Sequence, residues 1–204
     1  MPLYRDFSDD NATILIWKYD EEEELHINDL LEPENVTKVA DYHPKKLLEV
    51  LMVRKLLKSL KPESKILYKD REPFLEPNDA EISITHSFPF AAVAISQNKI
   101  GIDLEKFNPK ILRVIDKFTY EHERGFIPSD NEVTFYTIIW SVKESMYKIH
   151  HSKYWSLKKN YEVKPFELKH LFDISCRVYD DAFSDEFKAR VKFFDDYCFT
   201  IVEE

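Results

Sequence analysis

Two kinds of hydrophobic periodicity alternate along the chain and predict its secondary structure. Apolar residues at every second position, or in short β-branched runs, predict strands, whereas apolar residues repeating every three to four positions predict helices. The predicted strands are residues 12–19, 81–85, 90–96, 99–103, 171–178, 190–194 and 197–202. The predicted helices are residues 44–60, 111–118 and 131–150, with a shorter helical turn at residues 121–124.

The order of these elements predicts an α+β fold. Each half of the chain runs from strand to helices to strands, although no literal sequence repeat accompanies this likeness. We therefore expect two similar halves that meet near residue 98, an N-terminal half of residues 1–98 and a C-terminal half of residues 99–204.

Local signals mark several ends of these elements. Pro44 suits the first turn of the long N-terminal helix, and Thr119 is a candidate N-cap for the turn at residues 121–124. Residues 71–73 (Arg-Glu-Pro) and the pair 195–196 (Asp-Asp) predict turns. Residues 81–85 and 90–96 read as an antiparallel pair joined by a short loop.

Composition narrows the class of protein. The net charge of -9 argues against general affinity for nucleic acids. No apolar run approaches the roughly 18 residues of a membrane span, and the N-terminus lacks the layout of a secretory signal. Cys176 and Cys198 are too few for a disulfide framework, so buried thiols are expected. These features predict a cytoplasmic protein that binds neither nucleic acid nor membrane.

Positive charge is concentrated in one segment of this acidic chain. Residues 38–71 contain ten Lys/Arg against four Asp/Glu, a local balance of +6. The segment is either a solvated helix face or a subsite for an anionic ligand, and the charge pattern favours the two readings equally.

Carboxylates are the strongest candidates for chemistry. Asp103 and Glu105 end a short apolar strand and lie on one face of it, while Glu144 and Lys148 lie one turn apart on a helix. Mg²⁺ prefers oxygen ligands and often shares one or two carboxylates with substrate phosphates. Taken separately, each pair is more simply a strand end or a surface ion pair. Together they can hold a divalent cation beside a polyphosphate.

Two further segments carry candidate residues whose simpler roles are structural. His86, between Thr85 and Ser87 at a strand end, can donate to a phosphate oxygen, but a lone histidine there is more often a structural hydrogen-bonding group. Trp140 is more simply a core anchor on its helix.

The motifs in this order resemble the 4'-phosphopantetheinyl transferase superfamily. The blocks are Thr-His-Ser at 85–87, Ile-Gly-Ile-Asp-Leu-Glu-Lys at 100–106 and Trp-Ser-x-Lys-Glu-Ser-x-x-Lys at 140–148, and residues 47–54 also resemble a helix of that family. The match is closer to the long, monomeric, surfactin-synthetase type than to the short trimeric type. The resemblance implies two α+β halves related by a pseudo-two-fold axis.

The resemblance also implies an activity and a role for each residue. The enzyme would transfer the 4'-phosphopantetheine arm of coenzyme A to a serine of an apo acyl or peptidyl carrier protein and release adenosine 3',5'-bisphosphate. Asp103, Glu105 and Glu144 would bind Mg²⁺, and Glu144 or a metal-bound water would help to deprotonate the serine. Lys148 would stabilise the leaving phosphate, and His86 would contact coenzyme A phosphates.

The same resemblance assigns the basic segment and reveals departures from the family pattern. Lys45 would contact the 3'-phosphate of the nucleotide, with Lys38 near another basic position. The family's Gly-Lys-Pro is replaced by residues 71–73, so Arg71 is expected to supply that cation. Gly101 is expected to allow packing against the neighbouring half, the loop at residues 148–152 lacks the family's glycine, and either Glu121 or Glu123 joins the site.

Two other functions remain as alternatives. A non-catalytic carrier-protein or nucleotide-binding module of the same fold is expected to have lost a metal ligand or Lys148, and neither loss is seen. A magnesium-dependent phosphohydrolase would consume coenzyme A without any carrier protein.

Overall fold

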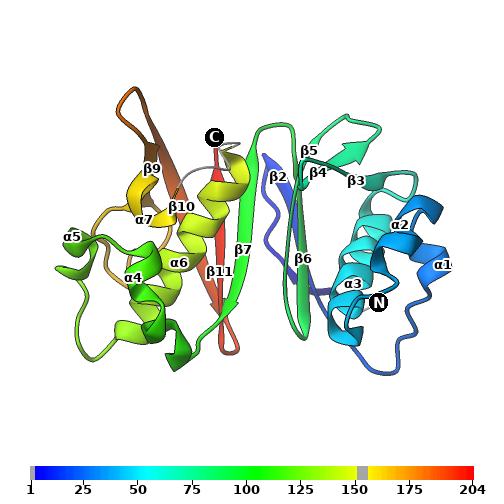
Figure 1. The fold of residues 1–204 in the computed structure, drawn as a ribbon, viewed down its shortest axis with the longest axis horizontal. Helices are drawn as coiled ribbons and strands as arrows, with labels where there is room; N and C mark the ends of the chain where they lie inside the picture. Colours follow the sequence, from blue (N-terminus) through cyan, green and yellow to red (C-terminus); the bar gives the residue numbers. More distant parts are fainter. Residues whose placement is uncertain (1–2, 151–155) are drawn as a thin grey trace. The chain divides into compact units, whose positions relative to one another are not determined.

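The computed structural model describes residues 3–150 and 156–204 and confirms the α+β class (Figure 1). The chain divides into two compact units, Met1–Asn98 and Lys99–Glu204. The expected two-fold relation between the halves, and the roles assigned to them, stay predictions. In the part of the chain that is described, no helix combines the length and apolarity needed to cross a membrane.

Unit 1 is built on a four-stranded antiparallel sheet in the order β1-β2-β6-β5. Its strands are β1 (Leu3–Asp6), β2 (Ala12–Lys18), β5 (Glu81–Ser87) and β6 (Phe90–Ser96). Helix α3 (Pro44–Leu60) packs on this sheet, preceded by α1 (Ile27–Leu30) and α2 (Pro33–Val39). A separate hairpin joins β3 (Lys65–Lys69) to β4 (Glu72–Glu76).

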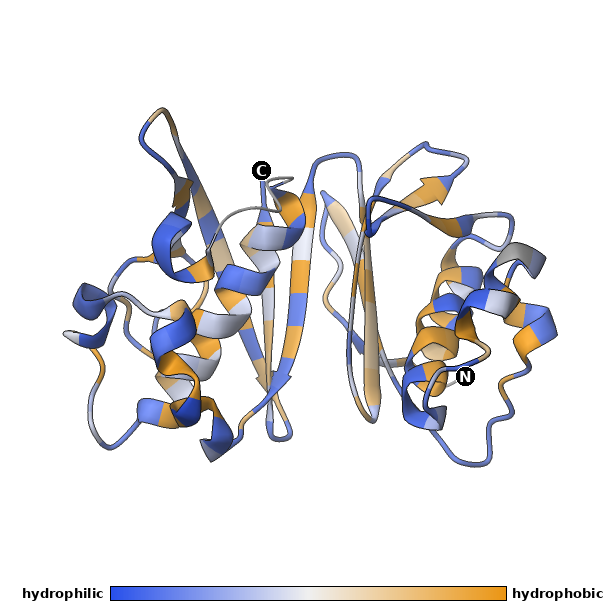
Figure 2. Ribbon diagram, viewed as in Figure 1, coloured by the Kyte–Doolittle hydropathy of each residue, from blue (hydrophilic) through white to orange (hydrophobic). Residues whose placement is uncertain are grey.

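The core of unit 1 lies between α3 and the sheet. Met52 and Leu56 of α3 pack with Trp17 of β2 and Val93 of β6, and all four side chains are fully buried. In Figure 2, α3 alternates between apolar and polar residues, whereas β6 is apolar over most of its length. This contrast fits a helix with one solvated face and a central strand covered by its neighbours.

Unit 2 is built on a five-stranded antiparallel sheet in the order β7-β11-β10-β9-β8. Its strands are β7 (Ile100–Lys106), β8 (Tyr161–Val163), β9 (Ile174–Tyr179), β10 (Ser184–Phe194) and β11 (Tyr197–Glu203). Helix α6 (Glu132–Ile149) lies across the sheet and contacts β7 and β11 most extensively (Figure 1). The shorter helices are η1 (Pro109–Arg113), α4 (Ile115–Phe118), α5 (Glu121–Arg124) and α7 (Leu157–Asn160).

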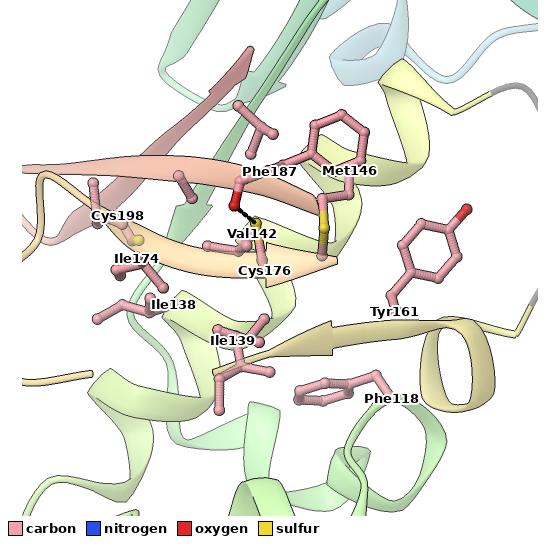
Figure 3. Packing of buried hydrophobic residues seen from close by; sticks show 14 of the residues in the cluster. Phe118, Ile138, Ile139, Val142, Met146, Tyr161, Ile174, Cys176, Phe187 and Cys198 are labelled. Carbon is pink, nitrogen blue, oxygen red and sulfur yellow. Dashed lines mark hydrogen bonds between the residues drawn. The ribbon is translucent and has the colours of Figure 1, made fainter. Parts of the chain in front are cut away.

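The core of unit 2 forms between α6 and the sheet. Ile138, Val142 and Met146 of α6 are fully buried against apolar residues of β8 to β11 (Figure 3). Cys176 and Cys198 are buried free thiols, as expected, and the Cys176 thiol donates to the Phe187 carbonyl at 3.6 Å. Their role is therefore packing.

The structure corrects three predicted boundaries. The strand expected to end at Asp103 continues through Glu105 to Lys106, because it pairs with β11 along its whole length. The helix expected at residues 111–118 is a 3₁₀ helix followed by one turn of α-helix. Tyr120, not Thr119, is the N-cap of α5, because Thr119 instead terminates α4.

Two predicted strands also differ from the expected description. The strand predicted at 171–178 begins at Ile174, and the one predicted at 190–194 begins at Ser184, where a polar hairpin arm has no buried face. Residues 151–152 of the loop after Lys148 lie outside the described residues, so the expectation for that loop stays a prediction.

Candidate active site

Gly101 allows β7 to lie directly against α6. A Cβ atom at this position would lie 2.0 Å from the Ser145 carbonyl oxygen and 3.0 Å from a side-chain carbon of Ile149. The close neighbour of Gly101 is thus a helix of its own unit, and the expected packing against the neighbouring half stays a prediction. The absence of a side chain lets the strand that carries Asp103 and Glu105 approach the helix that carries Glu144 and Lys148.

Lys148 joins this helix to the strand. Its ammonium donates to Asp103 Oδ1 at 2.9 Å and to the Ile102 carbonyl at 2.7 Å. Asp103 is 6% exposed, whereas the Lys148 side chain keeps 27% of its surface accessible. The lysine therefore neutralises a buried carboxylate and still reaches solvent, where a ligand can meet it.

Glu105 is held by Trp140 and surrounded by negative charge. The Trp140 indole donates to Glu105 Oε1 at 2.8 Å, so this tryptophan, predicted only as a core anchor, also orients a carboxylate. Burial, the neighbouring charge of Asp103 and, less strongly, that of Glu144 raise the pKa of Glu105 to about 7. The three predicted carboxylates are therefore close enough to repel one another.

Glu144 completes this acidic group. Burial and the charge of Asp103 raise its pKa to about 6, against the opposing effect of Lys148. Three carboxylates share one ammonium, and this excess of negative oxygen ligands suits Mg²⁺. Among the described residues no three His, Cys, Asp or Glu side chains already stand as a metal-holding group, so the carboxylates would have to turn toward a shared ion.

Buried hydroxyl groups fix the register of α6 on the sheet. Thr200 of β11 lies opposite Asp103 in the strand pairing, and its hydroxyl donates to the Ser141 carbonyl at 3.0 Å. The Thr200 hydroxyl oxygen lies 2.9 Å from the Ser141 hydroxyl and 2.6 Å from the Ser145 hydroxyl. All three side chains are fully buried. The serines of the Trp-Ser-x-Lys-Glu-Ser motif are therefore structural groups that orient Glu144 and Lys148.

The other lysine of that motif, Lys143, is buried in a separate ion pair. Its ammonium donates to Glu123 Oε2 and to the Phe118 carbonyl, each at 2.7 Å, and neither charged side chain is exposed. Glu123 also accepts the backbone N–H groups of Tyr120 at 2.7 Å and Val163 at 2.9 Å. Glu123 therefore lies inside the unit as the partner of Lys143, whereas Glu121 is exposed. The sequence alone does not tell these two glutamates apart.

Unit 1 brings two of its predicted ligand-binding residues onto one surface. Lys45 in the first turn of α3 has its ammonium 5.6 Å from the centre of the Phe88 ring. One turn later, a Glu49 carboxylate oxygen lies 3.3 Å from His86 Nδ1. Helix α3 and the β5–β6 hairpin therefore hold Lys45 and His86 side by side, and Glu49 is a partner of His86 that sequence reasoning missed.

Arg71 lies on a different element of unit 1, the turn between β3 and β4. Its φ of 76° places it in the left-handed region that favours glycine. Arg71 therefore adopts a backbone shape that glycine adopts more readily. Lys38 is exposed on α2 and donates to Asn35 at 3.1 Å. For both residues, contact with a ligand stays a prediction.

Comparison with known proteins agrees with these motifs. The family model of the 4'-phosphopantetheinyl transferase superfamily matches residues 99–202, which is nearly all of unit 2. A curated relative, the 4'-phosphopantetheinyl transferase gsp of Aneurinibacillus migulanus, is 29% identical over 117 residues. The alignment covers 54% of this chain and 49% of that protein, so the chain spans about half the length of the curated relative it matches.

Proposed function

Because the chain belongs to the 4'-phosphopantetheinyl transferase superfamily, we propose that it transfers 4'-phosphopantetheine from coenzyme A to a serine of an apo acyl or peptidyl carrier protein. The observation that carries this proposal is the meeting of Asp103, Glu105, Glu144 and Lys148 where β7 packs on α6. A diphosphate substrate with a divalent cation matches this set of charges, since the cation offsets the excess of carboxylates.

The reaction replaces a phosphoanhydride bond of the coenzyme A diphosphate with a phosphoester bond to serine. The serine oxygen forms a bond to the phosphorus that carries the pantetheine arm, and the bond from that phosphorus to the bridging oxygen of the diphosphate breaks. Adenosine 3',5'-bisphosphate leaves, and Glu144 takes the serine proton directly or through a water. Lys148 offsets the charge that develops on the leaving phosphate.

Mg²⁺ is the cofactor that we propose for this site, held by Asp103, Glu105 and Glu144. When bound, it would neutralise the coenzyme A diphosphate and orient it for displacement. Trp140 donates a hydrogen bond to Glu105, and Lys148 donates one to Asp103, so a neighbouring side chain holds each of these two carboxylates. Lys45, Arg71 and His86 would contact the nucleotide phosphates. We propose a cytoplasmic monomer that acts on protein and coenzyme A.

The test is direct transfer. The protein is incubated with coenzyme A, Mg²⁺ and a panel of apo carrier proteins of fatty-acid and peptide-synthetase types. The carrier is expected to gain the mass of one phosphopantetheine, and the gain is expected to depend on Mg²⁺. Absence of transfer to every carrier would refute the proposal, and consumption of coenzyme A without a carrier would favour a phosphohydrolase instead.

A further inference from the structure

Phe88 is an unusual residue for its place in unit 1. Ser87 pairs with Phe90 across the β5–β6 hairpin, so Phe88 and Pro89 form its two-residue turn. Turn positions are mostly occupied by small or polar residues and proline, so an aromatic ring at the surface of a turn is uncommon. Phe88 is nevertheless 38% exposed, and it is absent from the buried cluster that forms the core of this unit. Core packing therefore does not explain a phenylalanine here.

The Phe88 ring is held in place although it is exposed. The Tyr19 backbone N–H donates to the Pro89 carbonyl at 2.8 Å, which ties the turn to the end of β2. The Tyr19 ring lies 6.1 Å from the Phe88 ring at an interplanar angle of 47°. An aromatic surface fixed in this way loses little conformational entropy when a flat ligand stacks on it.

The groups beside Phe88 indicate what kind of ligand would stack there. The Lys45 ammonium lies over the ring, 5.6 Å from its centre, and His86 lies two residues earlier on β5. A fixed aromatic ring beside the Lys45 ammonium and the His86 imidazole fits a ligand that combines a flat base with phosphate groups. A lipid or an apolar peptide would not need the two polar neighbours.

We propose that Phe88 is the stacking surface for the adenine base of coenzyme A, with Lys45 and His86 beside it for the nucleotide phosphates. The assignment of coenzyme A as the ligand rests on the proposed function. It adds a residue for base recognition that lies outside the metal and transfer chemistry of unit 2. Tyr19 acts as a positioning residue, because it holds the Phe88 turn through its backbone N–H.

The test measures nucleotide binding by the full chain without any carrier protein. Calorimetry with adenosine 3',5'-bisphosphate and with uridine 3',5'-bisphosphate compares the wild type with Phe88→Ser and Phe88→Tyr. Stacking of one base on an aromatic side chain accounts for a factor on the order of 10 in affinity. We therefore expect Phe88→Ser to bind the adenosine compound about 10-fold more weakly. Phe88→Tyr should bind the adenosine compound as tightly as the wild type does. Phe88→Ser should weaken binding of the uridine compound less, because the uracil ring is smaller and stacks over less area.

Serine is a good turn residue, so Phe88→Ser is expected to fold. Tyr68→Ser is the matched control, since Tyr68 is an exposed aromatic residue (46%) on another hairpin of the same unit. Unchanged adenosine bisphosphate affinity in Phe88→Ser, or an equal loss in Tyr68→Ser, would overturn the inference.

The outcomes separate this inference from the proposed function. If the wild type transfers phosphopantetheine and Phe88→Ser keeps the same KM for coenzyme A, the inference is wrong and the function stands. If the wild type binds the adenosine compound through Phe88 but modifies no carrier, the base site stands and the function is wrong. A wild type that binds neither nucleotide contradicts the base site.

Discussion

Two lysines of α6, five residues apart, form ion pairs of opposite character. Lys143 is fully buried with Glu123, and each oxygen of that carboxylate also accepts a backbone N–H group. Lys148 is partly exposed beside Asp103, in a group where three carboxylates share its single charge. The first set is balanced and closed, and the second has an excess of negative charge that opens to solvent. A balanced pair fixes a fold, whereas an unbalanced one can receive a cation and a phosphate.

The largest expected effect comes from the contact on which the carboxylate group depends. Gly101→Ala puts a methyl group 2.0 Å from the Ser145 carbonyl, which can move only if β7 and α6 separate. We expect a loss of more than about 4 kcal/mol in the free energy of unfolding, measured with urea.

Gly125→Ala is the control for that substitution. Gly125 has a φ of -66°, and a Cβ atom there would lie 3.4 Å from the nearest atom, the His122 carbonyl oxygen. The free energy of unfolding should change by less than about 1 kcal/mol. Similar losses for the two alanine variants would contradict the account of β7 and α6.

Glu144→Gln should separate chemistry from folding. The substitution removes a proton acceptor and one of three mutually repelling carboxylates. We expect kcat to fall on the order of 10³-fold, about 4 kcal/mol in the barrier. Coenzyme A affinity should fall far less, and the free energy of unfolding should stay equal or rise. Equal losses of coenzyme A affinity and of rate would show that Glu144 binds substrate without acting in the transfer step.

Lys143→Met tests the balanced pair. The variant leaves Glu123 buried without its cation, and we expect the free energy of unfolding to fall by about 3 kcal/mol. Adding Glu123→Gln should recover part of that loss, because the uncompensated charge is then absent. The exposed Lys117→Met is the control and should change stability by less than about 0.5 kcal/mol. A loss below about 1 kcal/mol for Lys143→Met would argue against a structural role.

Magnesium addition should give the smallest effect. Mg²⁺ at ten times its dissociation constant is expected to stabilise the folded protein by about 1.4 kcal/mol, seen as a rise in Tm. Glu105→Gln should reduce that rise in Tm. Potassium chloride at the same ionic strength is the control and should not raise Tm. An identical response in wild type and Glu105→Gln would remove Glu105 from the metal ligands.

Strong local patterns made much of the fold predictable. The long periodic helices and the short apolar strands were found with small errors at their ends, since period and burial agree there. The strand from Ile100 was expected to stop at Asp103, because a sequence does not show that β11 continues to pair with it as far as Lys106. The polar arm of β10 was missed for a related reason, as its residues 184–186 are exposed.

The sequence selects a set of residues for the site but does not divide roles among them. Motif spacing selects Asp103, Glu105, Glu144 and Lys148, which lie where β7 packs on α6, and their roles in metal binding and transfer stay predictions. In the sequence, Lys143 and Lys148 are both lysines beside or near Glu144, and nothing distinguishes the buried one. Burial depends on the segment that covers α6, and that segment carries Glu123, whose role becomes visible only after folding.

Single-turnover transfer by Glu144→Gln and by Lys143→Met, compared at equal concentrations of folded protein, tests the central claim most directly. Formation of holo carrier is followed by intact mass with saturating coenzyme A and Mg²⁺. The account predicts that Lys143→Met keeps its rate per folded molecule within about tenfold, whereas Glu144→Gln loses on the order of 10³-fold. A larger loss in Lys143→Met than in Glu144→Gln would contradict it.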